Sequence, residues 1–318
     1  MIIAKITSGL GNQMFQYAAA RRLANYHNTE LKLDISHFSK NNERTYDLKY
    51  FNIVENIATP IDIFKVYKLE GINRLSFKKI FGKKFSDKFN NLIEKKIKKA
   101  YYNFNPESNN KPALLRGKIL AQNFCHFDER VLTAPDNVYM LGYWQSEKYF
   151  KDVENIIRKE FTFKNPPHGK NEELSREIKS NNSVSIHIRR GDYINNPAVH
   201  KDFHICDIDY YLRSIAYISK QITNPIFYVF SDDISWVKEN LKMPYSMIFV
   251  DSNTSQNNFE DMRLMSLCKH NIVANSSFSW WSAWLNENKN KIIVAPKEWV
   301  RIKNYITRDI VPEGWNRI

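Results

Sequence analysis

The chain has 318 residues, 43% hydrophobic and 25% charged, which is the balance of a globular protein long enough to form two domains. It contains no run of about 18 apolar residues and no charged region ahead of its first apolar residues, so we expect neither a transmembrane helix nor a signal peptide. Its three cysteines, Cys125, Cys206 and Cys268, lie far apart, which argues against a disulfide framework or a zinc site and favours a cytoplasmic protein.

The positive charge of the chain is concentrated in one segment. The formal net charge is +13, and residues 65–99 hold twelve Lys and Arg against three acidic residues. A nucleic-acid-binding protein would instead spread basic and exposed aromatic residues through its central motifs, so we expect no nucleic-acid partner. This Lys-rich segment favours peripheral association with an anionic membrane, here the inner membrane face, and a solvated Lys-rich helix is the alternative.

The N-terminal residues have the pattern of a βαβ unit. We predict a strand over residues 2–7, a loop over 9–11, a helix over 12–27 and a second strand over 30–34. The two glycines of the loop allow a ligand to approach the backbone closely, but Met14 occupies the place of the third glycine of the dinucleotide-binding pattern. An NAD site is therefore disfavoured, and a tight turn is the alternative role of this loop.

Composition divides the chain into two predicted domains. Residues 1–165 form the N-terminal domain, with a divergent insertion rich in Lys and Asn near 60–125. Residues 163–169 include two consecutive prolines and are the best candidate for a linker. Residues 170–300 then form the C-terminal domain, and residues 301–318 form a C-terminal tail.

The second half alternates short apolar runs with amphipathic segments. The predicted strands are residues 184–188, 226–230, 247–250, 272–274 and 291–295. The predicted helices are residues 209–221, 235–241, 259–268 and 277–286. Such alternation indicates a parallel sheet covered by helices on both faces, with the ligand beyond the carboxyl ends of its strands. We therefore expect an α/β protein with two Rossmann-like domains facing each other across a cleft.

Two adjacent arginines follow the first of these strands, in the motif HIRRGDY (187–193). Neighbouring side chains at a strand end point to opposite sides, so one of Arg189 and Arg190 can face the ligand while the other pairs with Asp192 or packs below. The planar guanidinium suits a diphosphate because it donates several hydrogen bonds and keeps its charge. A salt bridge without a ligand is the alternative.

A second motif, Asn275-Ser276-Ser277-Phe278, opens the predicted helix 277–286. Backbone N–H groups at a helix N-terminus form an anion site, although ordinary capping by Ser276 or Ser277 is the alternative.

Two carboxylate pairs, Asp232-Asp233 and Glu260-Asp261, also stand where helices begin. Helix capping explains them, and recognition of the two-donor edge of guanine by one carboxylate is the alternative. Asp207 and Asp209 match a DxD metal motif, but they precede a helix, and we assign them to capping.

Five stretches together resemble the bacterial α-1,2-fucosyltransferases of glycosyltransferase family 11. They are GLGNQMFQYA (9–18), HIRRGDY (187–193), YVFSDD (228–233), FEDMRLMSLCKHNIVA (259–274) and NSSFSWWSAWL (275–285). The resemblance covers residues 1–35 and about 140–300 and is weak across 60–125.

The resemblance implies a GT-B fold with an acceptor-side N-terminal domain and a C-terminal domain that binds a GDP-sugar. The implied reaction transfers L-fucose from the co-substrate GDP-β-L-fucose, with inversion, to the 2-hydroxyl of a terminal β-galactoside on an oligosaccharide or glycolipid. The resemblance also implies that the reaction requires no cofactor and no metal. A transferase for another GDP-sugar, or a non-catalytic protein that binds sugars or anions, is the alternative.

The resemblance also implies roles for individual residues. Arg189 contacts the β-phosphate, His187 lies beside the nucleotide, and Asp261 reads guanine by analogy with the core and protein O-fucosyltransferases. The candidate catalytic residues are Arg189 and Asp192. The candidate substrate-binding residues are Gly11, Asn12, His187, Arg190, Asp261, Ser276, Ser277 and Phe278. The catalytic base stays open among Asp192, His200, Asp202 and His204.

Overall fold

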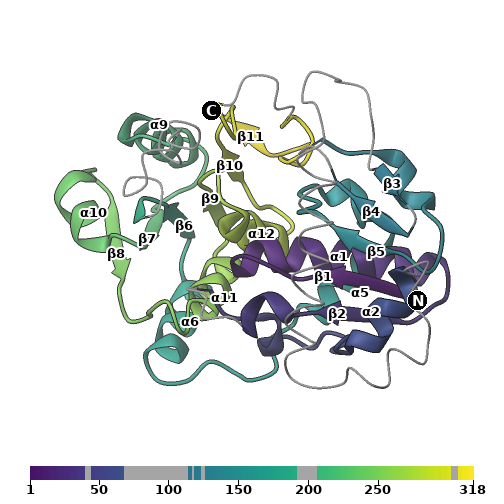
Figure 1. Cartoon of the computed structure of the whole chain (residues 1–318). Helices are drawn as coiled ribbons and strands as arrows, with labels where there is room; N and C mark the ends of the chain where they lie inside the picture. The colour runs from purple at the N-terminus through teal and green to yellow at the C-terminus, as the bar shows by residue number, and fades with distance from the viewer. Residues whose placement is uncertain (40–43, 68–113, 117, 123–125, 192–205, 302–306) are drawn as a thin grey trace.

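The computed structural model describes residues 1–39, 44–67, 114–116, 118–122, 126–191, 206–301 and 307–318. In these residues the chain forms two β-sheets, and helices pack against both of them (Figure 1). The first half of the sequence forms one sheet and the second half forms the other. Most of the Lys-rich segment lies outside the described residues, and so do Asp192, His200, Asp202 and His204.

The first sheet has five strands in the order β2-β1-β5-β4-β3. The strands are β1 Ile2–Lys5, β2 Leu31–Asp34, β3 Leu114–Arg116, β4 Ile119–Ala121 and β5 Tyr139–Leu141. All pairs are parallel except β3 with β4, at the edge of the sheet. The helices of this half are α1 Leu10–Tyr26, α2 Pro60–Tyr67 and α5 Glu154–Glu160. Short 3-10 helices span η1 Ser36–Ser39, η2 Leu48–Tyr50, η3 Glu129–Thr133, η4 Glu147–Tyr149 and η5 Lys151–Val153.

The predicted βαβ unit is present as β1, α1 and β2, with one correction at the start of its helix. Helix α1 begins at Leu10, after Gly9 as the N-cap residue, two residues earlier than predicted, so Gly11 lies in its first turn rather than in a loop before it. Gly9 has no side chain with which to cap the helix, so the usual N-cap signal is missing from the sequence.

The second sheet has six parallel strands in the order β11-β10-β9-β6-β7-β8. The strands are β6 Ser183–Ile188, β7 Ile226–Ser231, β8 Ser246–Val250, β9 His270–Ile272, β10 Ile293–Ala295 and β11 Asn316–Arg317. The helices are α6 Lys170–Ser180, α9 Ile208–Ser219, α10 Ile234–Asn240, α11 Phe259–Leu267 and α12 Ser277–Leu285. Every residue of the central strand β6 is buried, as expected when helices cover both faces. Strand β11 places the end of the predicted C-terminal tail in this sheet.

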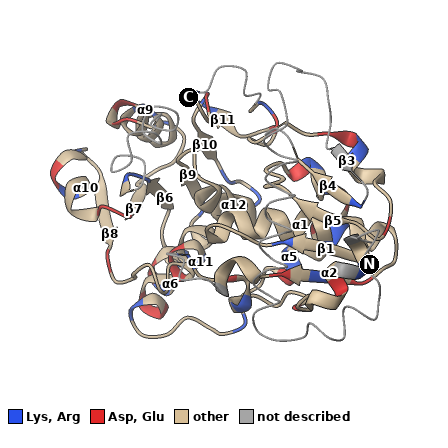
Figure 2. Ribbon diagram, in the orientation of Figure 1, with Lys and Arg blue, Asp and Glu red and all other residues tan. Residues whose placement is uncertain are grey.

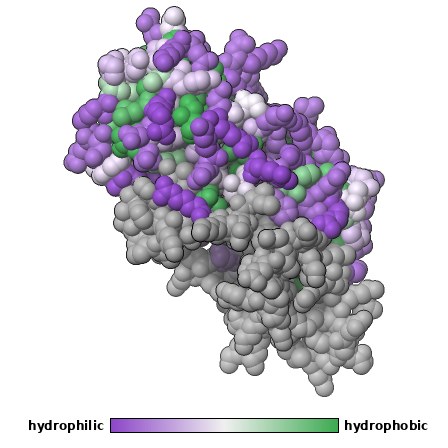
Figure 3. Space-filling view, turned by 90° about the horizontal axis from the view of Figure 1, so that it is seen from above, coloured by the Kyte–Doolittle hydropathy of each residue, from purple (hydrophilic) through white to green (hydrophobic). Residues whose placement is uncertain are grey.

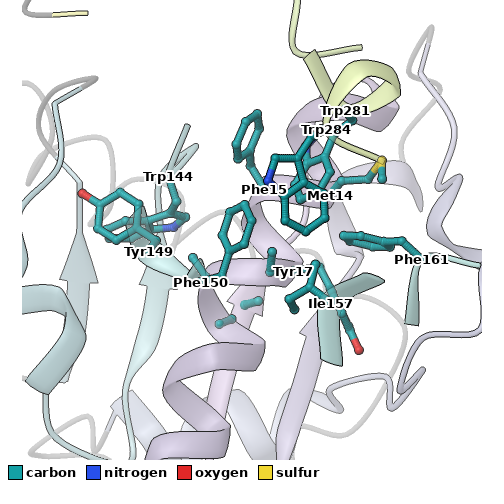
Figure 4. Close-up of a cluster of buried hydrophobic side chains, with 14 of the residues drawn as sticks. Met14, Phe15, Tyr17, Trp144, Tyr149, Phe150, Ile157, Phe161, Trp281 and Trp284 are labelled. Atoms are coloured by element: carbon teal, nitrogen blue, oxygen red, sulfur yellow. The ribbon is translucent and has the colours of Figure 1, made fainter. Parts of the chain in front are cut away.

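An aromatic cluster joins the two halves. Helix α12 of the second half packs against α1 of the first, so that the ring of Phe15 lies 4.5 Å from Trp280 and 4.9 Å from Trp281, centroid to centroid. Phe150, also from the first half, stacks on Trp281 at 5.3 Å (Figure 4). Each such pair contributes about 0.5–1.5 kcal/mol beyond the area it buries. The cluster therefore fixes the two halves against each other.

Charge and polarity are distributed as this packing requires. The ribbons of α12, β9 and β10 carry no charged residues, whereas α6, α9 and α10 carry both signs (Figure 2). Seen from above, the described surface is mostly hydrophilic, with small apolar patches (Figure 3). None of the described helices combines the length and the apolar character needed to cross a membrane.

Candidate functional site

A cleft of about 920 Å³ lies between the two halves. Its first-half wall consists of residues that follow β1, β2, β4 and β5, and most of its second-half wall consists of residues that follow β6, β7, β8, β9 and β10. Ligands of open α/β sheets bind beyond the carboxyl ends of the strands, and here both sheets direct these ends into one cleft. This is the GT-B-like arrangement that the resemblance implied.

The N-terminus of α12 opens into the cleft. Asn275, Ser276, Ser277 and Phe278 all line it, and the Ser276 side chain caps the helix by accepting a hydrogen bond from the Phe278 N–H at 3.3 Å. The predicted cap is therefore confirmed. The positive end of the helix dipole also faces the cleft, which makes this wall suitable for an anion.

The two adjacent arginines at the end of β6 point in different directions. Arg189 lines the cleft, and its Nη1 atom lies 2.9 Å from Oδ2 of Asp232. Arg190 does not line the cleft: its Nε lies 3.3 Å from Oδ2 of Asp233, and its guanidinium lies 3.3 Å from the ring centroid of Trp236. The structure therefore places one arginine at the site and holds the other, a candidate substrate-binding residue, against α10.

Asp232 organises the loop that carries these arginines. Besides the ion pair with Arg189, it accepts hydrogen bonds from the backbone N–H groups of Arg190 at 2.9 Å and Gly191 at 3.1 Å. A Cβ atom on residue 191 would lie 2.8 Å from Oδ2 of Asp232, so a larger residue at this position would require the carboxylate to shift. The sequence suggested a cap or a base-reading carboxylate here, and the structure shows a residue that positions Arg189.

His187 forms part of the cleft wall from within β6. It is buried, and this burial lowers the pKa of its imidazole to about 4, with a further contribution from Arg189 and an opposing one from Asp232. The ring is therefore neutral at pH 7. Its Nδ1 atom accepts or donates no hydrogen bond within the described part of the chain, and its ring lies 5.6 Å from that of Phe278. A buried polar atom without a partner at a cleft wall is suited to bind a ligand.

Asp261 lies in the first turn of α11 and lines the cleft. The N-cap residue of this helix is Asn258, so the capping role considered for Asp261 is wrong. Its carboxylate accepts a hydrogen bond from Nδ2 of Asn253 at 2.7 Å. Burial, together with the nearby Glu260, raises the pKa of Asp261 to about 6, against the opposing effect of the hydrogen bond from Asn253. The carboxylate is therefore largely ionised at pH 7 but close to its titration range.

The first-half wall brings Gly11 and Asn12 to the cleft, and Oδ1 of Asn12 accepts a hydrogen bond from Nε2 of Gln145 at 2.7 Å. Asp47 and Tyr143 line the same wall, and no sequence pattern selects them. Both stand alone in loops, outside any motif, so only the folded chain brings them to the site.

The DxD match does not reach the cleft. Asp207 caps α9 by accepting a hydrogen bond from the Tyr210 N–H at 2.8 Å, which confirms the capping prediction. Within the described ranges, no three His, Cys, Asp or Glu side chains gather in a way that could hold a metal ion.

Sequence comparisons identify the family. The family model for glycosyl transferase family 11 matches residues 118–318, which include the second-half wall of the cleft. An alpha-1,2-colitosyltransferase of Escherichia coli is 32% identical, and the alignment covers 100% of this chain and 99% of that protein. The chain belongs to glycosyltransferase family 11.

Two further relatives of this family 11 member show how far the likeness extends. The O-antigen biosynthesis glycosyltransferase WbnK of Escherichia coli is 31% identical, over 92% of this chain and 93% of that protein. The galactoside alpha-(1,2)-fucosyltransferase 2 of Pongo pygmaeus is 27% identical, over 46% of this chain and 45% of that protein. The likeness is therefore end to end with the bacterial relatives and partial with the mammalian one.

Proposed function

We propose that this family 11 glycosyltransferase transfers L-fucose from GDP-β-L-fucose to the 2-hydroxyl of a terminal β-galactoside, forming an α-1,2 linkage. The observation that carries the proposal is the grouping of Arg189, the N-terminus of α12 and Asp261 along one wall of the cleft. The first two suit a diphosphate, and the third offers the carboxylate that the two-donor edge of guanine requires.

The proposed reaction is a displacement with inversion. The acceptor oxygen attacks C1 of the sugar from the face opposite GDP, the bond from C1 to the β-phosphate oxygen breaks, and the hydroxyl loses its proton. GDP leaves with one additional negative charge. Arg189 and the N-terminus of α12 stabilise this charge as it develops, and a fixed donor of this kind contributes about 2.7–4 kcal/mol.

The neutral His187 and the buried Asp261 complete the proposed donor site. His187 lies beside the nucleotide without adding positive charge, and its free Nδ1 atom can bind one donor hydroxyl or phosphate oxygen. Asp192 is our candidate for the general base, because it follows Arg189 in the same motif, and it lies outside the described residues.

GDP-colitose is a second candidate donor, because a colitosyltransferase is 32% identical over this whole chain. Colitose is L-fucose without its 3-hydroxyl, so the two donors differ by one hydrogen-bonding group. A site built to bind that hydroxyl rejects the deoxy sugar strongly, by about 10⁴–10⁵-fold in the best cases.

The deciding experiment compares GDP-fucose, GDP-colitose and GDP-mannose with a set of terminal β-galactosides, and determines the product linkage by NMR. The proposal expects GDP-fucose to give the highest kcat/KM and an α-1,2 product. A higher kcat/KM with GDP-colitose transfers the assignment to that donor. If no sugar is transferred from any of these donors, the result would favour the alternative of a non-catalytic protein that binds sugars or anions.

The acceptor is proposed to be a galactose-terminated oligosaccharide or glycolipid. The net charge of +9 in the Lys-rich segment supports peripheral binding to an anionic membrane, at about 1 kcal/mol for each basic residue near the lipid. Sedimentation with vesicles containing phosphatidylglycerol, but not with neutral phosphatidylcholine vesicles, is the expected result. High salt should abolish it.

A further inference from the structure

The first-half wall of the cleft carries two side chains that the proposed donor site does not use. Tyr143 follows β5 and keeps 44% of its surface exposed, although it lines the cleft. Asp47 lies between β2 and η2, lines the same cleft, and is only 7% exposed. An exposed aromatic ring and a nearly buried carboxylate thus share one wall.

Although Tyr143 is exposed, hydrogen-bonding contacts fix both its side chain and its backbone. Its hydroxyl lies 3.2 Å from Oγ of Ser8, and its backbone N–H donates to Oε1 of Gln122 at 3.0 Å. Ser8 and Trp144, which flank this arrangement, both adopt the left-handed backbone conformation, with φ of 65° and 55°. Such a conformation in residues other than glycine costs about 1–3 kcal/mol and is characteristic of functional sites.

Gln13 connects this support to Asp47. The Gln13 side chain is fully buried, and its Nε2 atom donates to the carbonyl oxygens of Ser8 and Thr45, both at 2.8 Å. Its Oε1 atom accepts a hydrogen bond from the Asp47 N–H at 2.9 Å. One buried amide therefore ties the segment that carries Asp47 to the loop that supports Tyr143, and the wall is fixed before any ligand binds.

One of the two carboxylate oxygens of Asp47 accepts no hydrogen bond from the described residues. Oδ1 accepts a hydrogen bond from Oγ1 of Thr45 at 2.7 Å, whereas Oδ2 accepts none from the residues that the structure describes. Burial raises the pKa of Asp47, against the opposing effects of Thr45, Lys49 and Arg44. A carboxylate at this wall repels a diphosphate, which belongs opposite it beside Arg189, but it binds an uncharged hydroxyl well.

We propose that Tyr143 and Asp47 form the acceptor-sugar subsite. The apolar C–H face of the acceptor ring packs on the Tyr143 ring, and Oδ2 of Asp47 accepts a hydrogen bond from one of the ring hydroxyls. A sugar ring presents both features, an apolar face and hydroxyl donors at its edge. The subsite rests on the proposed function only in that the acceptor is a sugar, and it holds for either donor.

The test compares Tyr143→Ala, Tyr143→Phe and Asp47→Asn with the wild type in acceptor KM, donor KM and GDP affinity by calorimetry. Tyr143→Ala and Asp47→Asn should each raise acceptor KM about tenfold, the scale of losing one aromatic anchor or one charged hydrogen bond. GDP affinity should be unchanged. Tyr143→Phe keeps the ring and should stay within about twofold of the wild type.

Tyr26→Ala is the matched control, because Tyr26 is 54% exposed and stands at the far end of the 17-residue helix α1, about 24 Å from its cleft end. It should leave acceptor KM unchanged. An unchanged acceptor KM in a folded Tyr143→Ala variant overturns the subsite, and so does a parallel loss of GDP affinity, which would place these residues in the donor site.

Failure of the proposed function would appear separately, as a wild type that transfers neither fucose nor colitose. In that event, saturation-transfer NMR with β-galactosides decides the subsite without catalysis. The wild type and Tyr143→Phe should show a saturation signal from the sugar, and Tyr143→Ala should lose it. An equal signal in all three proteins overturns the subsite.

Discussion

Gly11 and Ser277 meet backbone to backbone where the first turns of α1 and α12 come together: a Cβ atom on Gly11 would lie 2.6 Å from the carbonyl oxygen of Ser277. This contact joins the first-half wall of the cleft to the N-terminus of α12, the proposed phosphate-binding end. Gly11 therefore allows the two helices to approach closely at the proposed donor site, beside the aromatic cluster that joins the two halves.

Gly11→Ala should push the two helices apart. We expect a loss of about 1–3 kcal/mol in the free energy of unfolding, typical of overpacking, together with a higher donor KM. Gly9→Ala is the matched control, because a Cβ atom there meets nothing within 4 Å and the backbone φ is −76°. Denaturant unfolding and donor kinetics check both. If the two variants behave alike, the close approach has no consequence.

The second half of the fold was predictable from the sequence because its strands are short apolar runs separated by polar caps. Residues 184–188 and 226–230 were predicted as strands and form β6 and β7, and Asp207 caps its helix as predicted. The same alternation placed Arg189 and Ser277 at strand ends, and both line the cleft.

The first-half wall was not predictable in this way. Asp47 and Tyr143 are far apart in the sequence, and the buried side chain of Gln13 links their supporting loops through hydrogen bonds that leave no periodic signal. The role of Asp232 was missed for a related reason. A carboxylate that binds backbone N–H groups of another loop looks, in the sequence, like an ordinary helix cap.

Donor binding should weaken at low pH through Asp261. Its pKa is raised to about 6, and only the ionised carboxylate accepts both donors of the guanine edge. Donor KM should therefore be constant above about pH 7 and rise below pH 6, by up to about tenfold for each further pH unit. Asp261→Asn should raise donor KM at every pH and remove this dependence.

The raised pKa of Asp261 affects the stability of the fold in the opposite direction from donor binding. Because the folded pKa lies above the usual value of 3.8, the fold favours the protonated form, and stability from this group increases as the pH falls from about 6 towards 4. Donor KM and melting temperature between pH 5 and 8 separate the two effects. A flat donor KM over that range contradicts the role of Asp261.

Activity should survive chelation. In the proposed mechanism, Arg189 and the N-terminus of α12 supply the positive charge that the leaving diphosphate needs, and Asp207 is occupied as a helix cap. Transfer rates in excess EDTA should match those in its absence. A loss of activity that Mn²⁺ or Mg²⁺ restores would contradict this prediction and return Asp207 and Asp209 to consideration as metal ligands.

Asp232→Asn should impair catalysis more than folding. The amide has one acceptor oxygen, so it cannot accept from Arg189 and from two backbone N–H groups as the carboxylate does. We expect kcat to fall about tenfold or more, with a small change in melting temperature, because Arg189 loses its fixed position. Asp209→Asn, at an exposed residue of α9, is the control and should match the wild type. Equal kcat in the two variants would show that Arg189 needs no such support.

Arg189 and Arg190 should fail in different ways when removed. Arg189 lines the cleft, so Arg189→Ala removes a charge-assisted donor and should lower kcat about 10²-fold or more, with the fold intact. Arg189→Lys should restore little, because a point charge cannot reproduce the guanidinium fork. Arg190 packs on Trp236 and pairs with Asp233, so Arg190→Ala should lower the melting temperature, and activity should fall only in parallel with folding.

The two alanine variants decide the assignment when kcat, donor KM and melting temperature are measured together. Because the arginines are adjacent and of one type, each variant is the matched control of the other, and a general effect of lost charge would appear in both. If Arg190→Ala is instead folded but inactive, the proposed site stands, but Arg190 rather than Arg189 stabilises the diphosphate. A stable and fully active Arg189→Ala would remove the group on which the proposed charge stabilisation depends, since the N-terminus of α12 would then have to bind the diphosphate alone.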